Sequence, residues 1–308
     1  MSIDGVFEFM FDSIVIGGSF AGHAAALQLG RARQRTLLVD GGLPRNRFAA
    51  ASHGFLGQDG VSPAQILATA RQQLMRYATV EVRDGEVVNA VAIERGFRVS
   101  LANGQEEMAR TLILATGVRD LLPDIPGMQE RWGTSVLHCP YCHGYEVNQQ
   151  PLGVLANNAL AFHQAMILPD WGATTFFTQG LFEPSAEQVV ALASRGVQVE
   201  RSQVVELFGE APHLDGVRLA DGRTIAISAL FTSPQTVPVG TLAEKLGCAF
   251  EDGPTGPIIS TDQRQQTSVP GVFAAGDVAS PMPQVTVAAA SGVVAGGSAH
   301  QWLIFRDA

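Results

Sequence analysis

The stretch FDSIVIGGSFAG (residues 11–22) decides the fold. It begins with a short run rich in Ile and Val, turns on small residues and continues into HAAALQLGRAR (23–33), which has helical character. This pattern predicts a strand, a tight turn and a helix. A second predicted strand, TLLVD (36–40), ends on Asp40. Small turn residues let a backbone approach a pyrophosphate, and an acid after the second strand can hold a ribose hydroxyl, so the stretch predicts a dinucleotide-binding unit.

Two later stretches fit the same unit, although the glycine pattern itself is imperfect because Ser19 stands where the second glycine should be. LILATGVRD (112–120) predicts a strand that ends in small residues, and TSVPGVFAAGDVA (267–279) predicts a turn and a strand followed by Gly276 and Asp277. A carboxylate next to a glycine can reach a polyol chain. Taken singly, each stretch is also compatible with an ordinary buried strand and a loop acid.

Between these stretches, residues 119–239 form a separate segment. PLGVLANNALAFHQAMILPDWGATTFFTQG (151–180) begins like another strand, turn, helix and strand, and a Pro-rich stretch closes the segment. We therefore predict an α/β fold with two Rossmann-like domains, the second inserted in the first, so that the first domain is discontinuous and comprises 1–118 and 240–308.

Composition excludes several classes of function. The chain has 308 residues, 46% of them hydrophobic, which is enough for about two ordinary cores. The net charge is −9, and of the 20 basic residues only Lys245 is a lysine, so no basic cluster indicates a nucleic-acid partner. The N-terminal residues include acids where a signal peptide needs positive charge, which predicts a cytoplasmic protein. The apolar stretch 286–305 contains Ser, Gly, His and Gln, and favours a helix buried inside protein over a membrane span.

The stretch HCPYCHGY (138–145) carries the chemistry, and its C-x-x-C-H pattern has three interpretations. A c-type haem needs export, for which the N-terminus offers no signal. Zinc needs four ligands; Cys139 and Cys142 with a neighbouring histidine and Cys248 could be imagined, but adjacent residues seldom share one tetrahedron and no second CxxC exists. A redox dithiol needs only the pair, so we predict no metal site.

GGSFAG, LILATG, the CxxC pair and VPGVFAAGD occur in this order, and with them the chain resembles the low-molecular-weight thioredoxin reductases. These flavoproteins join an FAD domain to an inserted pyridine-nucleotide domain. The resemblance implies a homodimer and a bound FAD. The FAD contacts that it implies fall on the glycine turn, the acid that follows it, the loop 43–60, the two later strand ends and the start of the last helix: Gly17, Gly18, Ser19, Ala21, Gly22, Asp40, Gly41, Arg45, Asn46, His53, Thr116, Gly117, Gly276, Asp277, Gln284 and Val285. For Arg45, Asn46 and His53 a merely solvated loop is the alternative.

The resemblance also assigns catalytic roles around the cysteines. It places Cys142 facing the flavin and makes Cys139 the more accessible interchange thiol. A helix start beside the pair would lower a thiol pKa and populate the reactive thiolate. His143 stands where the family has an aspartate that donates a proton, and a histidine can play the same part. A structural histidine bonded to backbone is the alternative.

The inserted segment departs from the family. Asn158 replaces a glycine over which the NADPH pyrophosphate would pass, and FFTQGLFE (176–183) lacks the arginines that would bind its 2′-phosphate. Without that approach or charge, NADPH binding in the usual mode loses its physical basis. This combination looks like a divergent CPYCHG branch, which includes dithiol oxidases of natural-product pathways and reductase-like proteins that do not use NADPH.

We therefore predict an enzyme, an FAD-dependent thioredoxin reductase-like thiol/disulfide oxidoreductase. Its partners would be a thioredoxin-like protein or a small dithiol, with ferredoxin or oxygen as possible electron partners. Two alternatives remain: a dithiol oxidase that reduces oxygen, and a non-enzymatic flavin-binding redox sensor. If no nicotinamide stacks on the flavin, Trp302 or Phe305 could cover it, with ordinary core packing as the other interpretation.

Overall fold

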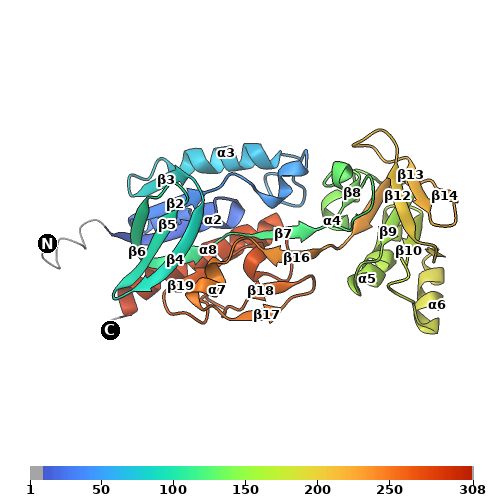
Figure 1. Ribbon diagram of the computed structural model, residues 1–308. Coiled ribbons are helices and arrows are strands. Elements are labelled where there is room, and N and C mark those ends of the chain that lie inside the picture. Colours follow the sequence, from blue (N-terminus) through green and yellow to red (C-terminus); the bar gives the residue numbers. More distant parts are fainter. Residues whose placement is uncertain (1–9, 307–308) are drawn as a thin grey trace, which may run out of the picture. The chain divides into compact units, whose positions relative to one another are not determined.

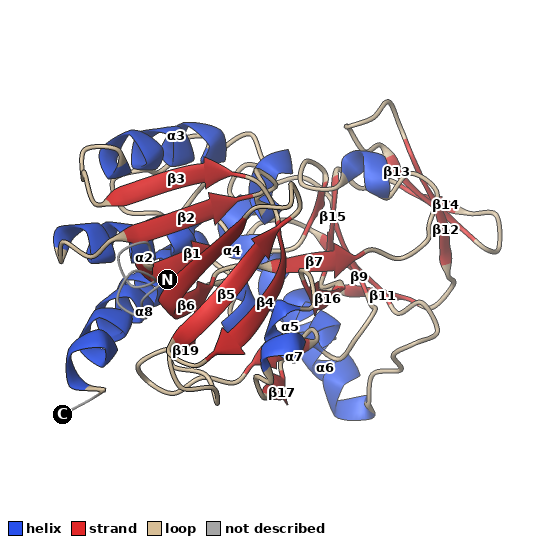
Figure 2. Cartoon of the chain, turned by 60° about the vertical axis from the view of Figure 1, so that its left-hand side comes forward, coloured by secondary structure: helices blue, strands red, loops and turns tan. Residues whose placement is uncertain are grey.

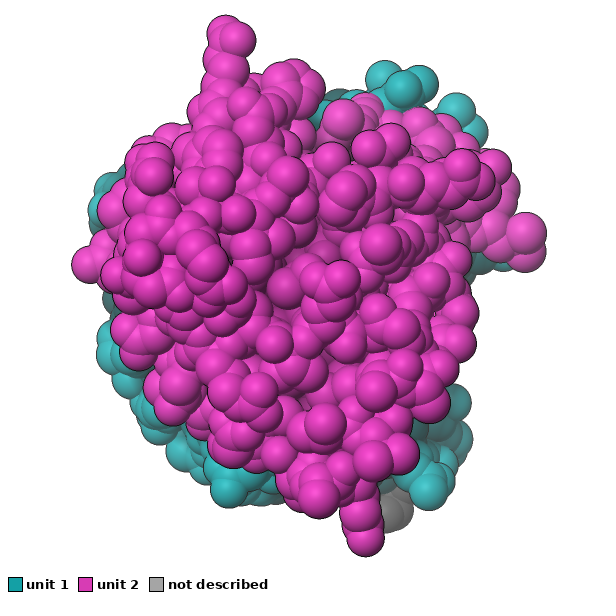
Figure 3. Space-filling model, turned by 90° about the vertical axis from the view of Figure 1, so that its right-hand side faces the viewer, with its two compact units in different colours: residues 1–47, 63–119, 237–308 teal, residues 48–62, 120–236 magenta. Residues whose placement is uncertain are grey.

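The computed structural model describes residues 10–306, so the N-terminal segment behind the prediction of a cytoplasmic protein lies mostly outside the described residues. The chain divides into two compact units, coloured separately in Figure 3. The first unit comprises Met1–Arg47, Pro63–Arg119 and Val237–Ala308, and the second comprises Phe48–Ser62 and Asp120–Thr236. Each unit contains a parallel sheet with helices, which confirms the predicted α/β class with two Rossmann-like units.

The first unit is built on a seven-stranded sheet in the order β3-β2-β1-β6-β5-β4, with β19 also paired to β6 (Figure 2). Its strands are β1 (Phe11–Ile16), β2 (Thr36–Asp40), β3 (Val80–Asp84), β4 (Val87–Ile93), β5 (Gly96–Leu101), β6 (Glu106–Leu114) and β19 (Val272–Ala274). β1, β2, β3, β6 and β19 run parallel, whereas β4 and β5 form an antiparallel extension. Because parallel strands end at the same edge, the segments after β1, β2, β6 and β19 lie along one edge of the sheet.

The helices and minor elements of the first unit are α2 (Phe20–Arg31), η1 (Arg45–Phe48), α3 (Pro63–Leu74), α7 (Leu242–Leu246), β17 (Phe250–Asp252), β18 (Pro257–Ile259), η4 (Asp277–Ala279) and α8 (Val285–Phe305). α8 lies directly on α2, because the glycines at 292 and 296 bring its backbone against the backbones of Ala21 and Ala25. The buried helix predicted over 286–305 is buried on one face only within this chain, and Val293 and Phe305 are exposed on its other sides. Among the described residues no helix is both long and apolar enough to be a membrane span.

The second unit has a five-stranded parallel sheet in the order β11-β10-β9-β15-β8 and a three-stranded antiparallel sheet, β12-β13-β14. Figure 1 labels β8, β9 and β10 of the first of these sheets and all three strands of the second. The strands are β8 (Val136–Leu137), β9 (Leu152–Leu155), β10 (Thr174–Phe177), β11 (Gln198–Glu200), β12 (Val204–Phe208), β13 (Gly216–Leu219), β14 (Thr224–Ile225) and β15 (Ala229–Thr232). The helices are η2 (Gln129–Arg131), α4 (Pro140–His143), α5 (Leu160–Ile167), η3 (Leu168–Asp170) and α6 (Ala186–Ser194). Strand β9 and helix α5 reproduce the predicted strand, turn and helix of the inserted segment.

The chain passes between the units through β7 (Val118–Leu121) and β16 (Gln235–Pro238), which pair with each other. These crossings fall near the predicted domain boundaries, which we retain as a proposal. One segment differs from that prediction: residues 48–62 group with the second unit. Phe48 packs against Gly133 so closely that a side chain at Gly133 would collide with it, which ties the start of this loop to the second unit.

Candidate functional site

The turn after β1 can be made only with glycines at two positions. Gly17 has φ +103°, a conformation that favours glycine, and a side chain there would strike the carbonyl of Ala115 at the end of β6. A side chain at Gly22 would strike the carbonyl of Gly17. The turn is therefore drawn tightly between β1, β6 and the start of α2, and the lack of side chains leaves its backbone open to the predicted pyrophosphate.

Asp40 is fixed against this turn by hydrogen bonds to one of its carboxylate oxygens. The backbone N–H groups of Gly18 and Gly42 donate to Asp40 Oδ1 at 3.0 and 3.1 Å. Within residues 10–306, Oδ2 has no hydrogen-bond partner. A half-buried carboxylate oxygen with unused lone pairs suits a ribose hydroxyl, so Asp40 fits the role predicted for it.

The start of α2 completes a site that fits a dinucleotide phosphate. Its N-cap, Ser19, makes no capping hydrogen bond with its side chain. The first N–H groups of a helix have no partner within the helix and attract an anion. Because the glycine turn also leaves no room for side chains, the residues present fit the FAD that the sequence predicts.

A second set of predicted cofactor residues lies along the same edge of the first unit. Arg45 Nη1 donates to Asp277 Oδ2 at 2.9 Å, and each side chain is about one-fifth exposed. The structure thus joins two predicted cofactor residues that are far apart in the sequence. The others follow β2 or β6, stand in η1, precede η4 or open α8: Gly41, Asn46, Thr116, Gly117, Gly276, Gln284 and Val285.

Trp302 does not lie at this edge. It packs on Gly271, which precedes β19, whereas the glycine turn follows β1. Both strands run parallel to β6, so the two positions are at opposite edges of the sheet. Trp302 therefore favours the interpretation of ordinary packing within one chain, because it is partly buried against the core of the first unit. Phe305 is exposed, and its covering of the flavin stays a hypothesis.

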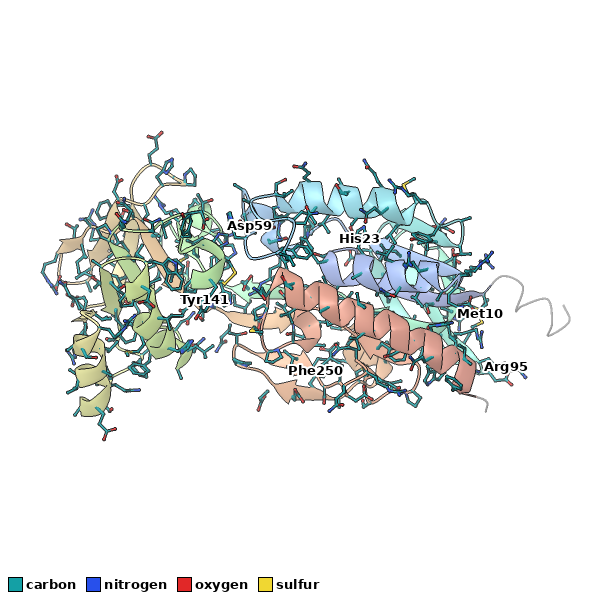
Figure 4. The ribbon with its side chains drawn as sticks, turned by 180° about the vertical axis from the view of Figure 1, so that it is seen from behind. Met10, His23, Asp59, Arg95, Tyr141 and Phe250 are labelled. Atoms are coloured by element: carbon teal, nitrogen blue, oxygen red, sulfur yellow. A yellow bond between two sulfur atoms is a disulfide. The ribbon has the colours of Figure 1, made fainter. Side chains whose placement is uncertain are left out.

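The two cysteines of the CxxC stretch form a disulfide, drawn as a yellow bond in Figure 4, with 5.2 Å between the Cα atoms of Cys139 and Cys142. Cys139 is the N-cap of α4, a helix of only four residues, and its carbonyl accepts a hydrogen bond from the Cys142 N–H at 3.1 Å. Pro140 opens the helix and suits that position because it lacks an N–H. The predicted redox pair is thus closed by one short helical turn.

The neighbouring residues fix this turn in place. Gly144 lies flush on the ring of Trp171, where a side chain would come within 2.8 Å of the indole. Tyr141 meets the same ring edge to face, with 5.6 Å between the ring centroids, and is 72% exposed. Gln164 on α5 is buried and donates to the carbonyl of His138 at 2.7 Å. The cysteine pair therefore stands on a packed base, and Tyr141, which lies between the two cysteines in the sequence, is exposed.

His143 is a titratable group that directly follows Cys142. Burial lowers its pKa, the carboxylate of Glu146 opposes that change, and a positive charge on His53 adds to it. His53, predicted from the sequence as a cofactor residue, groups with the second unit, and its Nε2 lies 3.4 Å from Glu146 Oε1. Glu146 was not predictable from the sequence, because nothing in its spacing indicates a partner in the loop 48–62.

At the edge of the second unit where a pyridine nucleotide is expected, two side chains make hydrogen bonds to the chain's own backbone. Asn158 Oδ1 accepts from the N–H of Leu160 at the start of α5 at 2.9 Å, and Asn158 Nδ2 donates to the carbonyl of Ser233 at 2.7 Å. Gln179, after β10, accepts from the N–H of Val204 at 2.6 Å. Both side chains are thereby committed to internal contacts.

One arginine near this edge was missed. Arg201 follows β11 and pairs with Glu183 on the loop after β10 at 2.8 Å. The stretch 176–183 itself contains no arginine, as the sequence shows, but Arg201, which follows the neighbouring strand β11, reaches Glu183 at the end of this stretch. Its charge is paired with a carboxylate. Within the described residues, no group of three or more potential ligands among His, Cys, Asp and Glu is placed to hold a metal ion.

Comparison with known proteins assigns these features to one family. Residues 11–292 match the pyridine nucleotide-disulphide oxidoreductases. An oxidoreductase from Agrobacterium tumefaciens of known structure is 52% identical, with a TM-score of 0.92 over 96% of this chain and 99% of that one. The structure of HlmI is 41% identical, with a TM-score of 0.89 over 97% and 94% of the two chains. Thioredoxin reductase tcpT from Claviceps purpurea is 35% identical over 95% of this chain and 94% of its own.

Proposed function

This chain belongs to the pyridine nucleotide-disulphide oxidoreductase family and is a thioredoxin reductase-like flavoenzyme; we propose that its FAD exchanges electrons with the Cys139–Cys142 pair and that its other electron partner is not NADPH bound in the usual mode. The observation that carries the second half of this proposal is the double hydrogen bonding of Asn158.

Asn158 removes two things that a pyrophosphate needs. Its carboxamide oxygen takes the N–H of Leu160, one of the donors that the start of α5 would offer to an anion. Its side chain also stands where a glycine would let the pyrophosphate approach the backbone. The Arg201–Glu183 pair excludes a nucleotide phosphate less firmly, because it is exposed and such pairs contribute little stability. Asn158 therefore supports the proposal more strongly than the lack of arginines in 176–183 does.

The first unit supplies the cofactor site. When bound, FAD supplies a centre that accepts and releases electron pairs. The glycine turn and the start of α2 would hold its phosphates, and Asp40 would hold its adenosine ribose. Asp277 and Arg45 would stand further along the same edge.

The second unit supplies the thiol chemistry. A substrate thiolate attacks Cys139 Sγ, the Cys139–Cys142 bond breaks, and Cys142 leaves as a thiolate. The second substrate thiol then attacks the mixed disulfide at the substrate sulfur, which forms the product disulfide and releases Cys139. Two electrons pass from substrate to pair. The two substrate protons are divided between Cys139 and a base, and we assign the base to His143.

A dithiol oxidase that passes the electrons to oxygen is the second candidate. The exposure of Tyr141 and Tyr145, at 72% and 77%, supports it, because exposed aromatic rings beside a dithiol suit a small apolar substrate. A thioredoxin-like protein remains the alternative substrate, with ferredoxin as a possible donor. A homodimer and a cytoplasmic location stay predictions.

An aerobic assay of the holoenzyme tests the function. Dithiothreitol and reduced thioredoxin are supplied separately, and peroxide release and thiol loss are measured, with Cys139→Ser as the inactive control. Peroxide formed in step with dithiothreitol oxidation is expected of the oxidase, and slow peroxide release with efficient exchange is expected of the reductase. Absence of thiol turnover with either substrate would leave a sensor and refute the enzyme proposed here.

A further inference from the structure

The loop 48–62 is a closed structure that presents His53. Ser52 and Val61 form an isolated bridge, with the N–H of Ser52 donating to the carbonyl of Val61 at 2.8 Å. The N–H of Gly60 donates back to Ser52 at 2.9 Å. Inside the loop, Asp59 Oδ1 accepts from the N–H of Gly54 at 2.8 Å. His53 is therefore held between two backbone contacts of its own loop.

His53 lies between two carboxylates. Its Nδ1 is 3.6 Å from Asp59 Oδ1, and its Nε2 is 3.4 Å from Glu146 Oε1. The His53 side chain is 22% exposed, compared with 40% for Glu146 and 70% for Asp59. The more sheltered ion-pair contact thus joins the loop to Glu146, which follows the CxxC turn of the same unit.

Glu146 stands three residues after His143, at the exit of the helical turn that carries the dithiol. The charged groups that act on His143 are Glu146, whose carboxylate raises its pKa, and His53, whose positive charge lowers it. Asp59 faces His53 from the other side. Burial is the largest influence and lowers the pKa of His143, so without Glu146 this imidazole would hold a proton less readily.

We propose that His53 and Glu146 are positioning residues for His143: His53 holds the Glu146 carboxylate close to the CxxC turn, and that carboxylate keeps His143 able to take the proton released in thiol exchange. The inference rests on the proposed function, because it assigns the same proton to His143. It also gives the loop 48–62 a role at the dithiol in place of the cofactor role predicted for His53.

The two ways in which His53 could act on His143, by holding Glu146 in place or by its own charge, predict opposite changes in the pKa of His143 when His53 is replaced. If His53 acted on His143 through its charge alone, His53→Ala would raise the pKa of His143. If His53 holds Glu146, His53→Ala frees that carboxylate and lowers the pKa of His143 instead. His53→Gln keeps an N–H donor at a similar reach without the charge, so it should preserve the contact with Glu146 and spare the pKa.

The direct experiment is a histidine-selective NMR titration of the oxidised holoenzyme, with the His143 signal assigned by its loss in His143→Gln. We expect Glu146→Gln and His53→Ala to lower the pKa of His143, His53→Gln to leave it unchanged or higher, and the double variant to match Glu146→Gln alone. Glu187→Gln, an exposed acid on α6 of the same unit, is the matched control and should have no effect.

A higher pKa in His53→Ala, or no change in Glu146→Gln, would overturn the proposal. If His53→Ala fails to fold, Glu146→Gln and His53→Gln still decide it. The titration needs no substrate or electron partner, so its outcome is independent of whether the proposed function is correct. The rate of thiol exchange gives a second readout: Glu146→Gln should lose about tenfold, short of the roughly 10²- to 10⁴-fold expected when a general acid or base is removed.

Discussion

Replacing Gly18 by alanine should weaken FAD binding without disturbing the backbone conformation. Gly18 is not among the glycines with positive φ, so alanine is conformationally acceptable there. The obstacle is the side chain of Asp40, whose Cβ and Cγ would both lie 2.5 Å from the new methyl carbon. Asp40 must therefore retreat by about 1 Å to reach an ordinary contact of ~3.5 Å.

That retreat breaks the hydrogen bond of 3.0 Å from the Gly18 N–H to Asp40 Oδ1. A hydrogen bond to a charged group contributes about 1.5–3 kcal/mol. Since Asp40 is then displaced from the position in which it would hold the ribose, we expect the Kd for FAD to rise about 10- to 150-fold, at ~1.4 kcal/mol per tenfold.

The assay is the quenching of FAD fluorescence as apoprotein is titrated, with urea unfolding of the same samples as a check on folding. Gly297→Ala is the matched control, because no atom other than those of its chain neighbours and of the backbone of α8 lies within 4 Å of the new methyl group. It should leave the Kd unchanged and stabilise the protein by about 0.5–1 kcal/mol. A Gly18→Ala protein that binds FAD within twofold of the parent would refute the reasoning about Asp40.

Three further predictions concern stability. Asn158→Gly loses the hydrogen bonds to the N–H of Leu160 and to the carbonyl of Ser233, so the free energy of unfolding in urea should fall by about 1–3 kcal/mol; an unchanged value would contradict a stabilising role for these two bonds. Arg131 is buried and donates to three backbone carbonyls, so Arg131→Met should cost about 3–5 kcal/mol and lower Tm, whereas a change under ~1 kcal/mol would disagree. Burial lowers the pKa of His23, so the unfolded chain binds this proton more readily and stability falls as pH drops below the ordinary value of 6.5. His23→Phe should reduce the loss of stability between about pH 8 and about pH 5, and an equally steep loss would count against it.

Local spacing made much of the first unit predictable. β1, the glycine turn, α2, β2 and Asp40 are all specified within 30 residues of chain, where hydrophobic periodicity and small residues act on their immediate neighbours. The Cys139–Cys142 disulfide was predictable for the same reason, because a spacing of three fits one helical turn. The family followed from the order of such local motifs along the chain.

Contacts between distant segments were not predictable. No local pattern joins His53 to Glu146, and their meeting depends on how the loop 48–62 packs against the second unit. Arg201 reaches Glu183 only because β11 is the neighbour of β10 in the sheet. The composition of α8 indicated burial, but burial also depends on what lies opposite each face, and only the face against α2 is covered within this chain.

The most direct test of the central claim is anaerobic stopped-flow absorbance of the oxidised holoenzyme mixed with NADPH or with dithiothreitol. Dithiothreitol should bleach the flavin, because the Cys139–Cys142 pair is present to accept its electrons. Equimolar NADPH should not, because Asn158 takes the N–H of Leu160 at the start of α5. Cys142→Ser should abolish the bleaching by dithiothreitol. Rapid bleaching of the flavin by modest NADPH would contradict the account.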